Sequence, residues 1–108
     1  MSQGNEILEA IELAIAMEKN FSRAAKLADK AAVAIITGKL KPKAGGYLNA
    51  KVLDFVLDHV SEDYRRVLGS EFNLAMERGD WKGYCRLEFE ALSSALSLII
   101  IKRRIYHG

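Results

Sequence analysis

Apolar residues recur every three or four positions along most of this chain, and no stretch alternates between apolar and polar residues. A repeat of three to four is the period of one face of an α-helix, whereas a half-buried β-strand repeats every two residues. The pattern therefore predicts an all-α fold, with Met17 and Met76 among its core residues.

Glycine and polar cap residues divide the helical pattern into segments. We expect a first helix from about Asn5 to Lys19 and a second that begins at Phe21-Ser22, read as hydrophobic staple and N-cap, and stops at Gly38. The remaining segments are a third helix along Leu48 to Val60, a fourth between the cap Ser61 and Gly79, and a last one capped by Asp80.

The chain has 108 residues, which is enough for one domain with one hydrophobic core. Half of the residues are hydrophobic and 28% are charged, a composition typical of globular rather than disordered proteins. We therefore predict that residues 1–108 form a single-domain bundle of about five helices.

Basic residues are concentrated in the middle of the chain. Residues 19–51 contain eight basic residues and one acidic residue, although the net charge of the whole chain is only +2. The centre of this region is a predicted loop over residues 38–46, between the second and third helices. Its lysines, Lys39, Lys41 and Lys43, alternate along a segment that Pro42 keeps extended.

Three further basic residues precede this loop on the second helix. Arg23, Lys26 and Lys30 are spaced by three and four positions, so they share one helix face that leads toward the loop. Ammonium groups contact phosphates as point charges, without reading base identity. The pattern favours a nucleic-acid-backbone site, and the alternative is a solvated linker with lysine-rich edges.

No catalytic or metal-binding pattern accompanies the basic region. The chain lacks the glycine-rich P-loop motif, and Cys85 lies on the apolar stripe of the last helix, as a buried structural thiol does. Asp54 and Asp58 lie four positions apart, which we interpret as a solvated acidic face rather than a metal site. Glu88 and Glu90 cannot share a helix face as an acid–base pair. We predict no enzyme, no metal and no cofactor.

The sequence also indicates where in the cell the protein is expected. Four glutamates interrupt the first apolar stretch, which argues against a signal peptide, and the apolar run Leu96 to Ile101 is too short to span a bilayer. A single cysteine allows no internal disulfide. We expect a cytoplasmic protein with no membrane partner.

Two stretches carry a family resemblance. The segment LKPKAGGYLNAKVLDFVLDHV (Leu40 to Val60) and the segment DWKGYCRLEFEAL (Asp80 to Leu92) resemble the small helical subunit of type III-A (Csm) CRISPR effector complexes. The chain departs from the family pattern at Lys51, where the family tends to carry arginine, and at SSAL (Ser93 to Leu96), which replaces the usual aromatic residue.

The resemblance implies a non-catalytic subunit of an antiviral complex. Such subunits stack on one another and on other effector subunits, and they contact the RNA backbone of the guide–target duplex. Carried onto this chain, the matching positions would be Lys39, Lys41, Lys43 and Lys51. The alternative is a helical protein–protein interaction module, such as an anti-defence inhibitor, adaptor or coat subunit. In that case Leu98 to Ile101 would be an exposed docking stripe.

Overall fold

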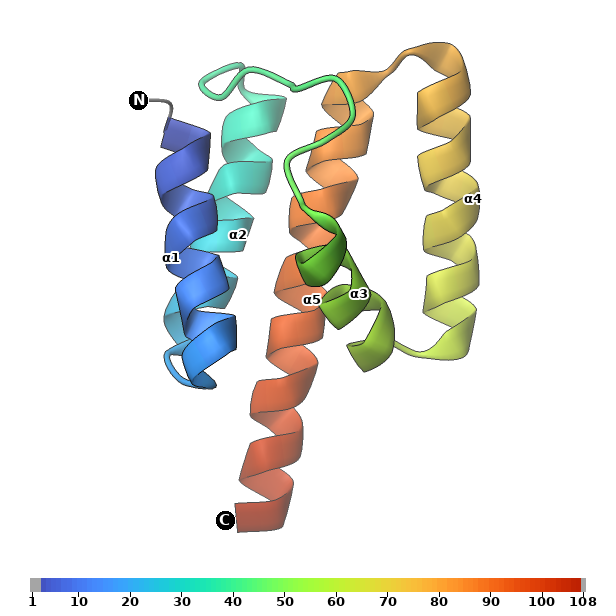
Figure 1. Cartoon of the computed structure of the whole chain (residues 1–108). Coiled ribbons are helices and arrows are strands. Elements are labelled where there is room, and N and C mark those ends of the chain that lie inside the picture. Colours follow the sequence, from blue (N-terminus) through green and yellow to red (C-terminus); the bar gives the residue numbers. More distant parts are fainter. Residues whose placement is uncertain (1–2, 108) are drawn as a thin grey trace.

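The computed structural model describes the backbone of residues 3–107 and the side chains of residues 5–105, and it consists of five helices (Figure 1). The all-α bundle predicted from the sequence is therefore confirmed. The helices are α1 (Gln3–Met17), α2 (Phe21–Ile36), α3 (Ala50–His59), α4 (Glu62–Arg78) and α5 (Trp81–His107).

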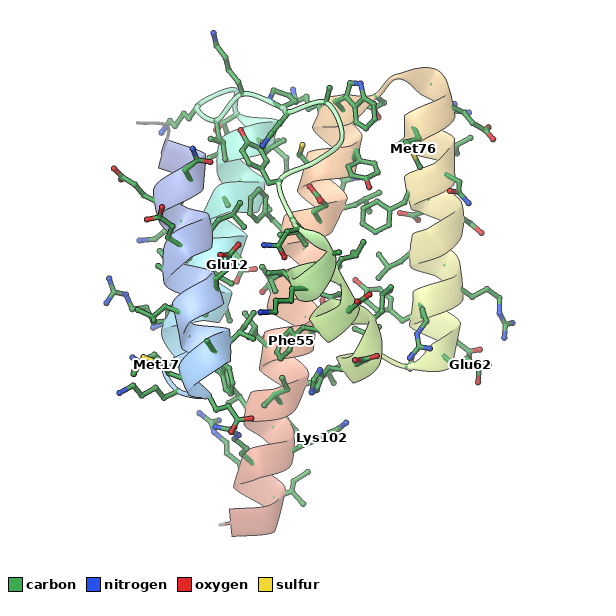
Figure 2. The ribbon with its side chains drawn as sticks, viewed as in Figure 1. Glu12, Met17, Phe55, Glu62, Met76 and Lys102 are labelled. Carbon is green, nitrogen blue, oxygen red and sulfur yellow. The ribbon has the colours of Figure 1, made fainter. Side chains whose placement is uncertain are left out.

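The long helix α5 is the centre of the bundle. It packs against α2, α3 and α4, and α1 is added on the other side of α2. At 27 residues α5 is about 40 Å long, so its carboxyl-terminal part extends beyond the other helices (Figure 1). Lys102 lies on this extending part (Figure 2).

The closest packing is between α2 and α5, where small side chains face the core. Ala24, Ala28 and Ala31 of α2 and Ala91 and Ala95 of α5 are all at most 1% exposed. Alanine side chains let two helix backbones approach each other closely. The many alanines of the second helix are therefore explained by its close packing against α5 on one side and α1 on another.

The buried side chains form two clusters. The larger cluster joins all five helices through residues such as Ile11, Val56, Leu68 and Leu96. The smaller cluster lies near the amino end of α5 and includes Ile35, Leu40, Cys85 and Phe89. Burying a side chain of this size contributes roughly 1.5–3 kcal/mol, so Leu40 fixes the loop that follows α2 to the core.

Most helix ends lie where the cap residues predicted them. The Ser61 hydroxyl accepts the Tyr64 N–H at 3.2 Å, the Asp80 carboxylate accepts the Gly83 N–H at 2.9 Å, and Gly79 ends α4 with φ 67°. The predicted cap of the second helix is wrong. Phe21 is already the first residue of α2, and the residue before it, Asn20, has left-handed backbone and no side-chain cap bond.

Two expected core residues are on the surface. Met17 and Met76 were predicted to be buried, but they are 50% and 48% exposed, because the neighbouring helices leave these positions partly uncovered. Between residues 3 and 107, none of the helices combines the length and the hydropathy needed to cross a membrane.

Candidate nucleic-acid interface

The segment of residues 38–49, called here the lysine loop, connects α2 to α3 across one end of the bundle (Figure 1). It leaves α2 at Gly38, whose φ of 80° is the left-handed conformation that glycine adopts without strain. Two residues later the Leu40 N–H donates to the Ala34 carbonyl at 3.0 Å, while the Leu40 side chain is buried. The loop is therefore fixed at its start.

The middle of the lysine loop is bonded to Cys85 of α5. The backbone N–H of Lys43 donates to the Cys85 sulfur at 3.4 Å, and the thiol donates to the Lys43 carbonyl at 3.5 Å. The Cys85 side chain is completely buried, and this burial raises the pKa of its thiol. The predicted buried structural cysteine thus has a specific task, which is to hold the backbone of Lys43.

The end of the lysine loop is bonded to Glu88, one turn further along α5. The N–H groups of Tyr47 and Leu48 donate to the two carboxylate oxygens of Glu88, at 2.7 and 3.0 Å. The residue is only 2% exposed. Burying a carboxylate is costly, and it is tolerated here because both oxygens accept backbone hydrogen bonds.

Burial raises the pKa of Glu88 from its usual value of 4.5 to about 7. The two N–H donors and the positive charge of Lys43 act in the opposite direction, because they favour the charged carboxylate. The loss of hydration outweighs them. Near neutral pH this carboxyl group is therefore divided between its protonated and its charged form.

The Tyr47 side chain also holds the lysine loop in place. Its ring lies 5.6 Å from that of Phe89, centroid to centroid, and its hydroxyl donates to the Lys41 carbonyl. The Lys43 ammonium lies 5.9 Å from the centre of the same ring. Hydrogen bonds and packing thus fix the backbone from Leu40 to Leu48, and the lysine loop is a built structure rather than a loose linker.

The lysine side chains of this loop point to solvent. Lys39, Lys41 and Lys43 are all exposed, and Leu40 is buried between the first two. Between residues 5 and 105, none of these three ammonium groups forms an ion pair. The result is a short cationic edge on a fixed backbone.

The basic residues of α2 are not brought to this edge. Arg23 and Lys26 lie in the first two turns of α2, at the end of the bundle opposite the lysine loop, and Lys30 is exposed about midway between. The helix has 16 residues and is about 24 Å long, so its first turn is far from the loop that follows its last turn. Arg23 and Lys26 instead line a hollow together with Arg103 and Arg104.

Lys51 has a different environment from the other lysines. It is exposed on the first turn of α3 and lines a cavity of about 530 Å³ between α1 and α3. Glu12 and Phe55, from these two helices, line the same cavity (Figure 2). Asp54 and Asp58 also line it, so Lys51 lies in a mixed rather than a basic surface.

The acidic residues of α3 do not converge on a metal site. Within the described part of the chain, no group of three or more His, Cys, Asp or Glu side chains lies in positions that could hold a metal ion. The Nδ1 of the His59 ring is hydrogen-bonded to the carbonyl oxygen of Phe55 at 2.8 Å. The His59 and Phe55 rings lie 4.5 Å apart, centroid to centroid. The contacts of His59 are those of a packed side chain.

Sequence reasoning missed Glu88, the residue that holds the loop. A signal was present: Glu88 follows Cys85 by three positions and precedes Leu92 by four, which puts one acid in the middle of an apolar helix face. Glu90 is on a more exposed face and pairs with Arg86 at 2.8 Å.

Comparisons of the chain with protein-family models, with curated proteins and with solved structures found no match. The interface described above is therefore interpreted from its own geometry.

Proposed function

We propose that this protein is a non-catalytic subunit that binds the backbone of RNA through its lysine loop, within a larger protein complex. The observation that carries the proposal is the fixed backbone beneath Lys39, Lys41 and Lys43. Two buried side chains of α5, Cys85 and Glu88, hold this backbone by four hydrogen bonds. Such an arrangement presents three lysine side chains from a backbone of fixed conformation.

The chemistry of the edge favours phosphate over bases. Lysines contact phosphates as point charges, and a pre-ordered site loses less conformational entropy on binding than a mobile one. Tyr47, the aromatic residue of the loop, is half-buried against Phe89 and donates its hydroxyl within the loop, so its ring is used to hold the loop. Binding is expected to be insensitive to base sequence.

The resemblance of the Leu40–Val60 and Asp80–Leu92 segments to the small subunit of type III-A CRISPR effectors supports the same proposal. In this chain the two segments contain the two sides of one contact, since Lys43, Tyr47 and Leu48 bond to Cys85 and Glu88. The RNA would then be the guide–target duplex, and the partners would be other subunits of an antiviral complex.

Fluorescence anisotropy of a labelled single-stranded RNA with a 5′-hydroxyl end, titrated at several salt concentrations, tests the proposal. Each phosphate contact to a single strand contributes about 0.7 to the slope of log affinity against log salt. Replacing Lys39, Lys41 and Lys43 with glutamine is therefore expected to reduce this slope by about 2. The affinity should fall to the same extent for RNAs of unrelated sequence.

A variant with the same charge change elsewhere is the control. Arg65 and Arg66 at the start of α4 and Lys102 on α5 are exposed toward the opposite end of the bundle, and their replacement with glutamine removes three positive charges far from the loop (Figure 1). This variant is expected to keep most of the salt slope. Equal losses in both triple variants would mean that only the overall charge matters, and no binding at low salt would contradict the proposal for the isolated subunit.

A second candidate function is protein–protein docking, favoured by the apolar surface of α5. Leu98, Ile101 and Ile105 are 37%, 52% and 73% exposed, and their spacing of three and four puts them on one stripe of the carboxyl-terminal part of the helix. Ile99, within the same run, is buried. Light scattering at rising concentration, with Ile101→Gln/Ile105→Gln as the comparison, would reveal an oligomer that depends on this stripe.

A further inference from the structure

The end of the bundle opposite the lysine loop carries a second cationic surface, an open hollow of about 1060 Å³ called here the arginine hollow. Two chain segments that are far apart in the sequence line it: the start of α2 and the extending part of α5. Among the described residues that line it, none is acidic and four are basic, namely Arg23, Lys26, Arg103 and Arg104.

Among residues 5–105, none of the four basic side chains of the arginine hollow has an ion-pair partner. The ion pairs in this part of the chain are Arg66 with Asp63 and Arg86 with Glu90, and both lie elsewhere. Like charges around one hollow repel each other, so the arrangement costs free energy in the free protein. A bound anion would remove that cost.

Arg103 is held in a fixed orientation within the hollow. Its guanidinium carbon lies 4.6 Å from the centre of the Phe21 ring, and Phe21 is itself buried. One of its N–H groups donates to the backbone carbonyl of Glu18 at 3.1 Å. The planar guanidinium is thus ordered before any ligand arrives, while its other N–H groups have no partner among the described residues.

Ordered arginines around a hollow select a particular kind of anion. The guanidinium fork matches two oxygens of a phosphate, and several forks and an ammonium group suit a dianion better than a singly charged carboxylate. The hollow also lies at the amino end of α2, where the helix dipole favours negative charge, but its basic side chains alone justify expecting an anion.

We propose that the arginine hollow binds a terminal phosphate group, that is, a phosphomonoester or diphosphate dianion. Such a group is found at the phosphorylated 5′ end of an RNA and in free nucleotides. The proposal goes beyond the RNA-backbone function, because it uses a different surface and does not depend on Lys39, Lys41 or Lys43.

Calorimetric titration of pyrophosphate into the full chain at low salt is the first test. We expect saturable binding that weakens about tenfold or more in the Arg103→Gln/Arg104→Gln variant, since each lost charge-assisted hydrogen bond is worth at least a factor of ten. The Lys39→Gln/Lys41→Gln variant also loses two positive charges, but at the other end of the molecule. Its affinity for pyrophosphate should change by less than about twofold.

A single substitution guards against a loss of structure. Arg103 contacts Phe21 and Glu18, so replacing it could disturb the α1–α2 turn, whereas Arg104 has no such contact among residues 5–105. Arg104→Gln alone should weaken pyrophosphate binding while circular dichroism and the unfolding midpoint stay unchanged. Arg103→Lys, which keeps the charge and loses the fork, should also bind more weakly than the wild-type protein.

Further titrations distinguish the two sources of phosphate. If a short RNA with a 5′-phosphate binds more tightly than the same RNA with a 5′-hydroxyl, and the difference disappears in Arg103→Gln/Arg104→Gln, the ligand is an RNA end. If adenosine diphosphate binds and the two RNAs do not differ, it is a free nucleotide. No saturable binding of pyrophosphate, or equal loss in the arginine and lysine double variants, would overturn the proposal. Since the lysine-loop test uses 5′-hydroxyl RNA, the two proposals can fail independently.

Discussion

Gly46 lies directly against the carboxylate of Glu88. A Cβ atom at position 46 would lie 2.5 and 2.6 Å from the two Glu88 oxygens and 2.6 Å from an edge carbon of Tyr84. The neighbouring residue, Gly45, has nearly the same backbone conformation, with φ 84° against 86°, but a Cβ there would meet no atom within 4 Å. Gly45 is therefore needed for its left-handed backbone conformation, and Gly46 is needed also because the space for a side chain is occupied by Glu88.

Alanine substitutions at these two glycines should differ in cost. Gly45→Ala is expected to lower the free energy of unfolding by about 1 kcal/mol, the strain of a left-handed alanine. Gly46→Ala adds a clash with a buried carboxylate, so we expect a loss of about 3 kcal/mol. Urea denaturation of both variants measures the difference, and equal losses would show that Gly46 is not in close contact with Glu88.

The raised pKa of Glu88 predicts that stability depends on pH. The folded protein keeps the Glu88 proton up to about pH 7, whereas the unfolded chain releases it near pH 4.5. The folded state therefore binds more protons between these values, and the free energy of unfolding contributed by this group falls as the pH rises from about 4.5 to about 7. The total change is on the order of 3 kcal/mol.

Urea denaturation at a series of pH values checks this dependence. Glu88→Gln has no proton to lose, so the decrease should be largely absent in that variant. Glu90→Gln, which changes the more exposed acid two residues later, should keep it. A decrease of the same size in Glu88→Gln would assign the pH dependence to other groups.

The single cysteine can report on the lysine loop. Cys85 is completely buried and its thiol pKa is raised by burial, so a thiol reagent should modify the native protein far more slowly than the unfolded chain. Gly46→Ala weakens the contact that covers this part of α5, and labelling should then become about tenfold faster for each 1.4 kcal/mol by which loop opening becomes easier. An unchanged labelling rate would mean that the loop does not control access to Cys85.

Two serines that look alike in the sequence should behave differently when replaced. Ser61 accepts the Tyr64 N–H as the N-cap of α4, so Ser61→Ala is expected to cost about 1 kcal/mol of unfolding free energy. Ser22 is the second residue of α2 and not its N-cap, which is Asn20. Ser22→Ala should therefore change the free energy of unfolding by less than about 0.5 kcal/mol. Thermal or urea denaturation of the pair distinguishes these roles.

Local pattern was sufficient to predict the helices of this protein but not the groups that they bring together. Periodicity and caps such as Ser61, Gly79 and Asp80 act within a few residues, so the helix boundaries and the buried position of Cys85 could be read directly. Met17 and Met76 could not be placed in the same way, because their exposure depends on which helix faces the neighbours leave uncovered.

The two candidate sites depend on contacts across long sequence separations. Glu88 is stable in the core because the N–H groups of Tyr47 and Leu48, about forty positions earlier, reach its carboxylate. Arg103 meets Phe21 because α5 is long enough to pass the start of α2. Contacts between residues this far apart cannot be predicted from a stretch of ten or twenty residues. The sequence therefore grouped Arg23 and Lys26 with the lysine loop, whereas in the structure they lie beside Arg103.

The buried alanines of α2 and α5 have a consequence for how this chain can vary. At Ala24, Ala28, Ala31, Ala91 and Ala95 an added methyl group would have to push neighbouring elements apart, since these side chains are at most 1% exposed. The exposed lysines and arginines carry no such restriction on size. Mutational tolerance should therefore be lowest at the smallest side chains of the core and highest in the charged surface around it.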